Sequence, residues 1–194
     1  MTIRLFVAVP IDEETRSCVN ARVRGFQELL PEHAERQLSW TRSENYHLTI
    51  QFLGATEPER IPDILAAMKS ACTSITPFQI RLGGLGVFPS SDHVRVVWIG
   101  LSKGERPMEQ LASILGRELD QAGFVPEERK FFPHLTIART RPRSRTVRLT
   151  EEISQQNALQ EEFSDDTNVS ELVLYESISG CYLERARFPL IGAT

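Results

Sequence analysis

The tetrapeptide His-Leu-Thr-Ile occurs at residues 47–50, within NYHLTIQFLG (residues 45–54), and again at residues 134–137, within FFPHLTIART (residues 131–140). The chain has only four histidines, so a tetrapeptide that begins at a histidine and occurs twice arises by chance in roughly one chain in a thousand. Each copy follows a helical stretch and lies in a β-rich run. The repeat therefore predicts two lobes of similar plan, each supplying one strand to a shared central cleft.

The spacing of each copy predicts which side chains share a face. Residues i and i+2 of a strand point the same way and lie roughly 6.5–7 Å apart. We expect the histidine and the threonine of each copy to face the cleft and the aliphatic residues to anchor the opposite face. In the first copy this alternation places His47, Thr49 and Gln51 on one face and Leu48, Ile50 and Phe52 on the other, which predicts Phe52 as a core residue.

Two imidazoles and two hydroxyls around one small volume suit the hydrolysis of a phosphodiester. A neutral imidazole acts as a base while a protonated one acts as an acid, and hydroxyls donate to phosphate oxygens without adding charge. The candidate residues are His47, His134, Thr49 and Thr136; the competing interpretation is ordinary strand histidines and β-forming threonines. A metal site needs further ligands, and no Asp, Glu or His stands beside either histidine at ligand spacing, so no metal is expected.

Composition limits the class of protein. The chain has 194 residues and a formal net charge of −4, with 41% hydrophobic and 25% charged residues, which is typical of one folded domain rather than a disordered chain or a coiled coil. No apolar run approaches the roughly 18 residues of a membrane span, and the N-terminus lacks a signal peptide pattern. Three widely spaced cysteines indicate neither a disulfide framework nor a zinc pattern. We expect a monomeric cytoplasmic protein that does not bind a membrane.

The order of periodic segments predicts an α+β fold with antiparallel sheets lining the cleft and helices outside. Strands and helices alternate without a regular βαβ rhythm, which disfavours a doubly wound parallel sheet. The aromatic residues Trp40, Phe52, Phe88 and Phe132 are expected mostly in the core, although any one of them could stack on an unpaired base. The glycines in LGGLGVFP (residues 82–89) indicate a bulge, or a place where another chain or a ligand comes close. Strands are expected over 3–9, 46–53, 78–88, 94–101, 132–138, 171–177 and 182–190, and helices from Asp12 to Pro31, over 58–72 and 107–122, and from about Thr150.

With these motifs the sequence resembles the two-histidine (2H) phosphoesterase superfamily, and within it the RNA 2′,3′-cyclic phosphodiesterases, also called 2′-5′ RNA ligases. The resemblance covers nearly the whole chain, as one bilobal domain over residues 1–194. It is carried by RLFVAVP, Trp40, HLTIQFLG, LGGLGVFP, VRVVWIGL, FFPHLTIAR, and LVLYES with YLERARFPL. It implies a cofactor-free enzyme that opens a 2′,3′-cyclic phosphate at an RNA 3′ end, tRNA fragments included, and leaves a 2′-phosphate. His134 would be the proton acceptor and His47 the proton donor, and the reverse reaction would join RNA ends through a 2′-5′ linkage.

The resemblance also implies that Arg139 contacts the phosphate or the nucleotide, against the simpler interpretation of a solvated loop cation. Arg139 opens a loop with Arg141, Arg143, Arg145 and Arg148, which would either steer an RNA backbone or remain a solvated arm. Two other functions stay open. One is hydrolysis of a small cyclic phosphate, such as a cyclic nucleotide or ADP-ribose 1″,2″-cyclic phosphate. The other is an RNA-end binding module without turnover.

Overall fold

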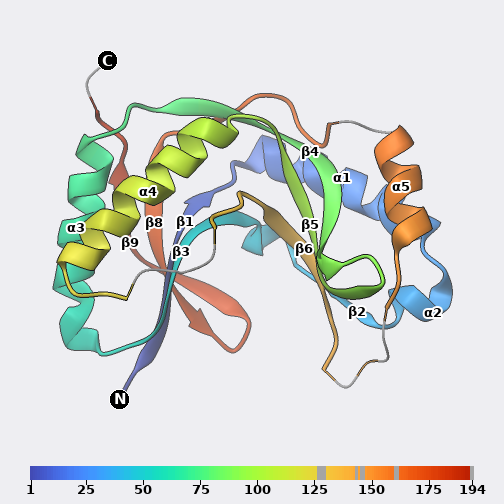
Figure 1. Cartoon of the computed structure of the whole chain (residues 1–194), viewed down its shortest axis with the longest axis horizontal. Coiled ribbons are helices and arrows are strands. Elements are labelled where there is room, and N and C mark those ends of the chain that lie inside the picture. The colour runs from blue at the N-terminus through green and yellow to red at the C-terminus, as the bar shows by residue number, and fades with distance from the viewer. Residues whose placement is uncertain (126–129, 143, 145–146, 160–161, 193–194) are drawn as a thin grey trace.

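The computed structural model describes residues 1–125, 130–142, 144, 147–159 and 162–192. Its longer helices and strands lie close to the expected ranges, whereas α2, β2 and β7 were not expected, and the elements are arranged in two halves (Figure 1). In chain order they are β1 (Ile3–Pro10), α1 (Glu13–Leu29), α2 (Glu32–Glu35), β2 (Leu38–Trp40), η1 (Ser43–Asn45), β3 (His47–Thr56), η2 (Pro58–Arg60), α3 (Ile61–Thr73), β4 (Phe78–Ser90), β5 (His93–Lys103), α4 (Glu105–Gln121), β6 (Leu135–Thr140), α5 (Thr150–Leu159), β7 (Thr167–Val169), β8 (Glu171–Ile178) and β9 (Cys181–Pro189).

Local sequence signals explain where several helices begin and end. The Asp12 carboxylate accepts a hydrogen bond from the Thr15 backbone N–H at 2.7 Å and so caps α1, as predicted. Gly123 follows α4 with φ +81°, a left-handed conformation that suits glycine at a helix end. The helix expected from Pro58 instead starts with the 3-10 turn η2 and becomes α-helical at Ile61.

The strands form one antiparallel sheet that joins the two halves. In the described residues it contains nine strands, in the order β7-β4-β5-β6-β3-β1-β8-β9, with β2 paired to β6. Strands β3 and β6, which carry the repeated tetrapeptide, are neighbours at the centre. Their antiparallel register pairs Leu48 with Leu135. The prediction of an α+β protein with two similar antiparallel halves is confirmed.

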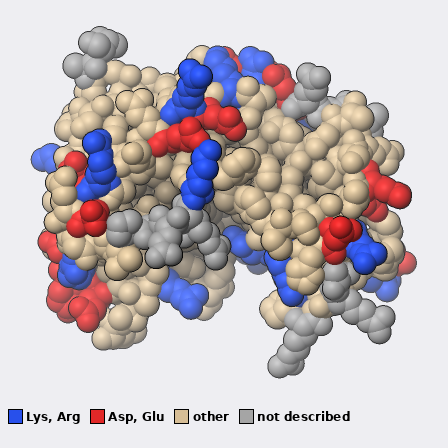
Figure 2. Space-filling view, viewed as in Figure 1, with Lys and Arg blue, Asp and Glu red and all other residues tan. Residues whose placement is uncertain are grey.

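Helices cover the outer side of each half. Figure 1 shows α3 and α4 beside the half that contains β1, β8 and β9, and α1 and α5 beside the half that contains β4, β5 and β6. The molecular outline is indented between the two halves, at the lower edge of Figure 2. In the portion of the chain that the structure describes, no helix combines the length and the apolar character that a membrane crossing requires.

Bulges interrupt the regular alternation on both central strands. On β3, Ala8 of β1 faces Thr49 and Val7 faces Gln51, so Ile50 is an extra residue. On β6, Trp98 of β5 faces Thr136 and Val97 faces Ala138, so Ile137 is the extra residue. Each bulge shifts the side-chain parity by one residue for the residues that follow it, as far as the next irregularity, which on β3 lies at Leu53.

The bulge on β3 overturns the expected burial of Phe52 and the expected placement of Gln51. The register pairs Gln51 with the fully buried Val7, and it pairs Phe52 with Phe6, on the side that carries His47. Phe52 is 57% exposed, whereas strict alternation predicted it in the core. The strand also continues past Gly54, which was expected to end it, as far as Thr56.

Candidate active site

The two tetrapeptides meet at the centre of the sheet with their polar residues on one face. Leu48 and Leu135 oppose each other and are fully buried, so the residues on either side of each leucine point to the other face. Extending this register by one residue in each direction sets His47 across from Thr136 and Thr49 across from His134. We call the sheet face that carries these four residues the site face.

Both imidazoles are held in the same tautomer by equivalent backbone carbonyls. The Nδ1 of His47 lies 2.7 Å from the Asn45 carbonyl oxygen, and the Nδ1 of His134 lies 2.7 Å from the Phe132 carbonyl oxygen. A carbonyl oxygen only accepts, so each Nδ1 carries the hydrogen and each neutral ring presents an unprotonated Nε2. In both motifs the carbonyl belongs to the residue two positions before the histidine, which makes the arrangement pseudosymmetric.

Burial keeps both imidazoles neutral near pH 7. It lowers the pKa of His47 to about 4; the Asn45 carbonyl opposes this shift, whereas the positive charge of Arg139, and that of His134 when it is protonated, add to it. Burial likewise lowers the pKa of His134, opposed by the Phe132 carbonyl and assisted by Arg139. The positive charge of Arg139 contributes to the lowered pKa of both histidines, so its guanidinium acts electrostatically on both rings.

The threonine contacts differ between the two motifs. The Thr49 hydroxyl lies 3.0 Å from the His47 Nε2, and since that nitrogen is the acceptor of the ring, Thr49 donates. The Nε2 of His134 has no hydrogen-bond partner among the described residues. The two halves therefore match in backbone and tautomer, but they differ in the protein contact of the Nε2 atom.

Arg139 reaches the site face because of the bulge on β6. It lies five residues after His134, an odd number that would place the two side chains on opposite faces of a regular strand. The extra residue Ile137 restores the parity, and Arg139 pairs with Val96 of β5. The guanidinium is exposed and makes no ion pair with any described residue. Arg143 and Arg145 of the same basic stretch lie outside the described residues.

An aromatic shell encloses each imidazole. The ring of Tyr182 meets His47 edge-on at 5.1 Å between centroids, and the ring of Phe6 lies 4.9 Å away. On the other half, the ring of Phe88 meets His134 edge-on at 5.2 Å, and the Trp98 ring lies at 6.2 Å. These aromatics account for the burial of the two imidazoles.

Sequence reasoning did not assign Phe6, Tyr182 or Trp98 to the site. The available signal was that each flanking segment of the resemblance carries an aromatic residue, RLFVAVP and VRVVWIGL among them. At Gly86 the close neighbour is a side chain of this chain: a Cβ there would lie 2.2 Å from the Trp98 ring, so the missing side chain makes room for the indole. A bulge in the same glycine-rich stretch is also present, between Gly83 and Leu85.

The aromatic residues expected in the core divide into two groups. Trp40 is half-buried and packs edge-on against Phe26 with centroids 6.3 Å apart, and Phe88 is half-buried against Trp98. Phe132 is 43% exposed because β6 begins only at Leu135, which leaves Phe132 before the strand. The Phe132 ring lies 6.4 Å from the His134 ring, and the exposed Phe52 ring lies 6.3 Å from the ring of Phe6. The expectation of a core position is confirmed for Trp40 and is wrong for Phe52, Phe88 and Phe132.

The described side chains contain no group of three or more His, Cys, Asp or Glu arranged to hold a metal ion. The donors at the site are instead two imidazoles, two hydroxyls and one guanidinium. This set can exchange protons through Nε2 atoms and bind an anion through Arg139 and the hydroxyls.

Comparison with known proteins identifies the family. The profile described as "LigT like Phosphoesterase" matches residues 15–98. An RNA 2′,3′-cyclic phosphodiesterase of Methanothermobacter thermautotrophicus is 34% identical over 146 residues, which span 75% of this chain and 76% of that protein. The crystal structure of TT0787 of Thermus thermophilus has a TM-score of 0.76 at 26% identity and covers 99% of this chain and 100% of its own. Escherichia coli LigT complexed with 3′-AMP shares the fold, with a TM-score of 0.73 at 24% identity over 98% of this chain and 99% of its own. The chain belongs to the LigT-like phosphoesterase family, within the 2H superfamily.

Proposed function

We propose that this enzyme hydrolyses 2′,3′-cyclic phosphate at RNA 3′ ends to a 2′-phosphate, without a metal ion. The observation that carries the proposal is the pair of equally oriented imidazoles on the site face, beside a guanidinium whose charge acts on both. Relatives that carry the name RNA 2′,3′-cyclic phosphodiesterase support the substrate class.

In the proposed reaction water attacks phosphorus in line with the bond to O3′. The His134 Nε2 accepts a proton from the water, and the His47 Nε2–H donates a proton to O3′ as the P–O3′ bond breaks. The products are a 2′-phosphate and a free 3′ hydroxyl, and the two histidines return to their starting states by proton exchange with solvent. A 5′ hydroxyl of a second RNA in the place of water would give a 2′-5′ linkage by the same steps.

The roles of the two histidines follow from their contacts. The free Nε2 of His134 can accept a hydrogen bond from a water molecule, which suits a base. The His47 Nε2 already accepts from Thr49, and protonation turns it into a donor while the Thr49 hydroxyl turns to a phosphate oxygen. The lowering of the His47 pKa by burial by itself disfavours a role as proton donor. We give the contacts more weight because the negative charge of a bound phosphodiester raises the pKa of both rings.

Arg139, Thr49 and Thr136 bind the phosphate oxygens in this proposal. Arginine offers a planar fork that matches two phosphate oxygens, and its charge compensates the negative charge of the phosphodiester. The exposed ring of Phe52 lies on the same face as His47 and offers a stacking surface for the terminal base.

The test is hydrolysis of an oligonucleotide that ends in a 2′,3′-cyclic phosphate, before and after exhaustive chelation, with the product identified by phosphorus NMR. We expect a 2′-phosphate product at a rate that chelation does not change. Loss of turnover on chelation, restored by a divalent ion, would overturn the metal-free mechanism. Binding without turnover would identify an RNA-end binding module instead. Turnover of ADP-ribose 1″,2″-cyclic phosphate or cyclic mononucleotides with no turnover of the oligonucleotide would identify the small-substrate alternative.

A further inference from the structure

A second arginine follows Arg139 along the site face. The backbone N–H of Arg141 donates to the Gln37 carbonyl at 2.8 Å, which continues the antiparallel pairing of β2 with β6 by one residue beyond Leu38 and Thr140. Arg141 is therefore extended and two positions beyond Arg139, so the two side chains start from the same face roughly 6.5–7 Å apart. The pseudosymmetric strand β3 has no arginine in its corresponding segment, residues 52–54.

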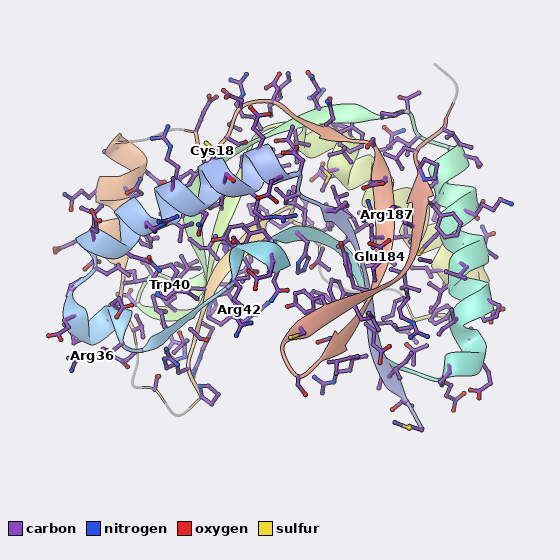
Figure 3. The ribbon with its side chains drawn as sticks, turned by 180° about the vertical axis from the view of Figure 1, so that it is seen from behind. Cys18, Arg36, Trp40, Arg42, Glu184 and Arg187 are labelled. Atoms are coloured by element: carbon purple, nitrogen blue, oxygen red, sulfur yellow. The ribbon has the colours of Figure 1, made fainter. Side chains whose placement is uncertain are left out.

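The Arg141 guanidinium is held through its Nε atom, and its two terminal nitrogens form no ion pair with the described residues. Its Nε donates to the Arg36 carbonyl oxygen at 3.2 Å, while the residue as a whole is exposed. Within the described ranges it forms no ion pair, in contrast to Arg36, which pairs with Glu32, and Arg42, which lies 3.9 Å from Glu44. Figure 3 shows Arg36, Trp40 and Arg42 along the part of the molecule that contains α2 and β2, from its outer corner toward the middle of the molecule.

Free guanidinium groups spaced along one strand match successive phosphates of a nucleic-acid strand. Arg139 acts electrostatically on both imidazoles and so lies where the reacting phosphate must bind. Arg141 lies two residues farther along the chain, directly after the end of β6. Its distance from Arg139 is of the same order as the spacing of neighbouring phosphates in an extended single-stranded nucleic acid. Held through Nε, its two terminal nitrogens remain available for phosphate oxygens.

We propose that Arg141 binds the phosphodiester that links the terminal nucleotide to its 5′ neighbour. This inference rests on the proposed function and deepens it, because it defines the minimal good substrate as a dinucleotide with a cyclic 3′ end. A cyclic mononucleotide with a free 5′ hydroxyl has no phosphate for Arg141. The side chain thus selects RNA ends over small cyclic phosphates.

The test compares kcat/KM for adenosine 2′,3′-cyclic phosphate with that for ApA ending in the same cyclic phosphate. A third substrate is the dinucleotide with an uncharged methylphosphonate at its internal linkage. For the unmodified protein we expect roughly a 10-fold preference for the charged dinucleotide over the methylphosphonate, since the neutral linkage lacks one charge-assisted contact with Arg141. In Arg141→Gln this preference falls to about one, because the substitution and the neutral linkage remove the same contact.

The matched control is Arg117→Gln, an exposed arginine on α4, on the outer side of the other half. It should keep the full preference for the charged linkage, and circular dichroism confirms that both variants are folded. If the preference is the same in Arg141→Gln as in the unmodified protein while both substrates are hydrolysed, the subsite is overturned and the proposed function stands. If the unmodified protein hydrolyses none of the three substrates, the proposed function falls, and the subsite falls with it.

Discussion

Leu48 and Leu135 face each other in antiparallel register at the centre of the sheet, and both are fully buried. This pair is the point about which the two His-x-Thr motifs are related. Because each leucine is flanked by the polar residues of its motif, the packing of two apolar side chains on one face sets the positions of two imidazoles on the other. The first prediction follows from that arrangement.

Removing either imidazole should nearly abolish turnover. We expect His47→Ala and His134→Ala each to lower kcat by roughly 10²–10⁴, the range for a general acid or base. The double variant should lose far less than the product of the two single effects, since the two residues act as one unit. Thr49→Val and Thr136→Val keep the shape and should cost less than either histidine change. Steady-state kinetics on a cyclic-phosphate dinucleotide tests this, and independent, multiplicative histidine effects would contradict it.

A phosphodiester with a nitrophenol leaving group separates the two proton transfers. Nitrophenolate leaves without being protonated, so the acid is dispensable and the base is not. We expect His47→Ala to regain most of its activity on this substrate and His134→Ala to remain inactive. The reverse pattern would exchange the two roles and leave the rest of the proposal unchanged.

The two histidines should titrate below their usual range in the free protein. We expect the ring signals of His47 to shift near pH 4 and those of His134 below pH 6.5 in NMR titrations. An unfolded chain binds these protons at about pH 6.5, so the free energy of unfolding should fall as the pH drops from about 6.5 to about 4. His47→Gln should flatten that pH dependence. A His47 signal that titrates at or above pH 6.5 would contradict the burial of this ring.

Phe52 should contribute to binding of the terminal nucleotide. Phe52→Ala removes the exposed ring, and we expect KM to rise roughly 10-fold with a smaller change in kcat, because stacking on one base contributes roughly 1–3 kcal/mol. Phe52→Tyr keeps the ring and serves as the control, with kinetics close to those of the unmodified protein. An abasic substrate should lose the same factor and become insensitive to Phe52→Ala. Equal sensitivity of both substrates to Phe52→Ala would show that the ring does not contact the base.

The contact between Gly86 and Trp98 gives a prediction for stability. A Cβ at Gly86 would stand 2.2 Å from the indole, so Gly86→Ala should lower the free energy of unfolding by roughly 1–3 kcal/mol. In a Trp98→Leu background the same substitution should cost less, because the overlapping ring is gone. At Gly116 within α4, nothing beyond the adjoining residues and the helix's own backbone lies within 4 Å of the added methyl, so Gly116→Ala should instead stabilise the fold by up to about 1 kcal/mol. Urea unfolding measures all four variants.

The repeated tetrapeptide was sufficient to predict the two halves and that the two strands carrying the histidines would come together. Within each motif the alternation of polar and apolar residues indicates both a strand and its polar face, so neighbouring residues in the sequence are enough for this prediction. Strand periodicity also located β1, β5, β8 and β9 to within a few residues. The three-residue strands β2 and β7 were not predicted, because segments this short have no measurable periodicity and exist through their pairing with β6 and β4.

The bulges could not be read from the sequence. Nothing in the letters of HLTIQF marks Ile50 as an extra residue, because the extra residue is defined by its partner strand. Strict alternation therefore placed Phe52 in the core. The same reasoning gave no structural account of Arg139, whose spacing from His134 is odd, and only the resemblance suggested a role for it. The aromatic shells escaped prediction for a similar reason, since they are built by neighbouring strands far away in sequence.

The paired bulges also give the site a direction. Both bring the fifth residue after the histidine to the site face, where one half presents the aromatic ring of Phe52 and the other presents the guanidinium of Arg139. Two identical halves would accept a phosphodiester in two opposite orientations, with either imidazole nearer the leaving oxygen. An apolar residue at one equivalent position and a cation at the other remove that degeneracy. In the proposed function this asymmetry gives the bound substrate one orientation, because the base stacks on Phe52 and the phosphate binds to Arg139.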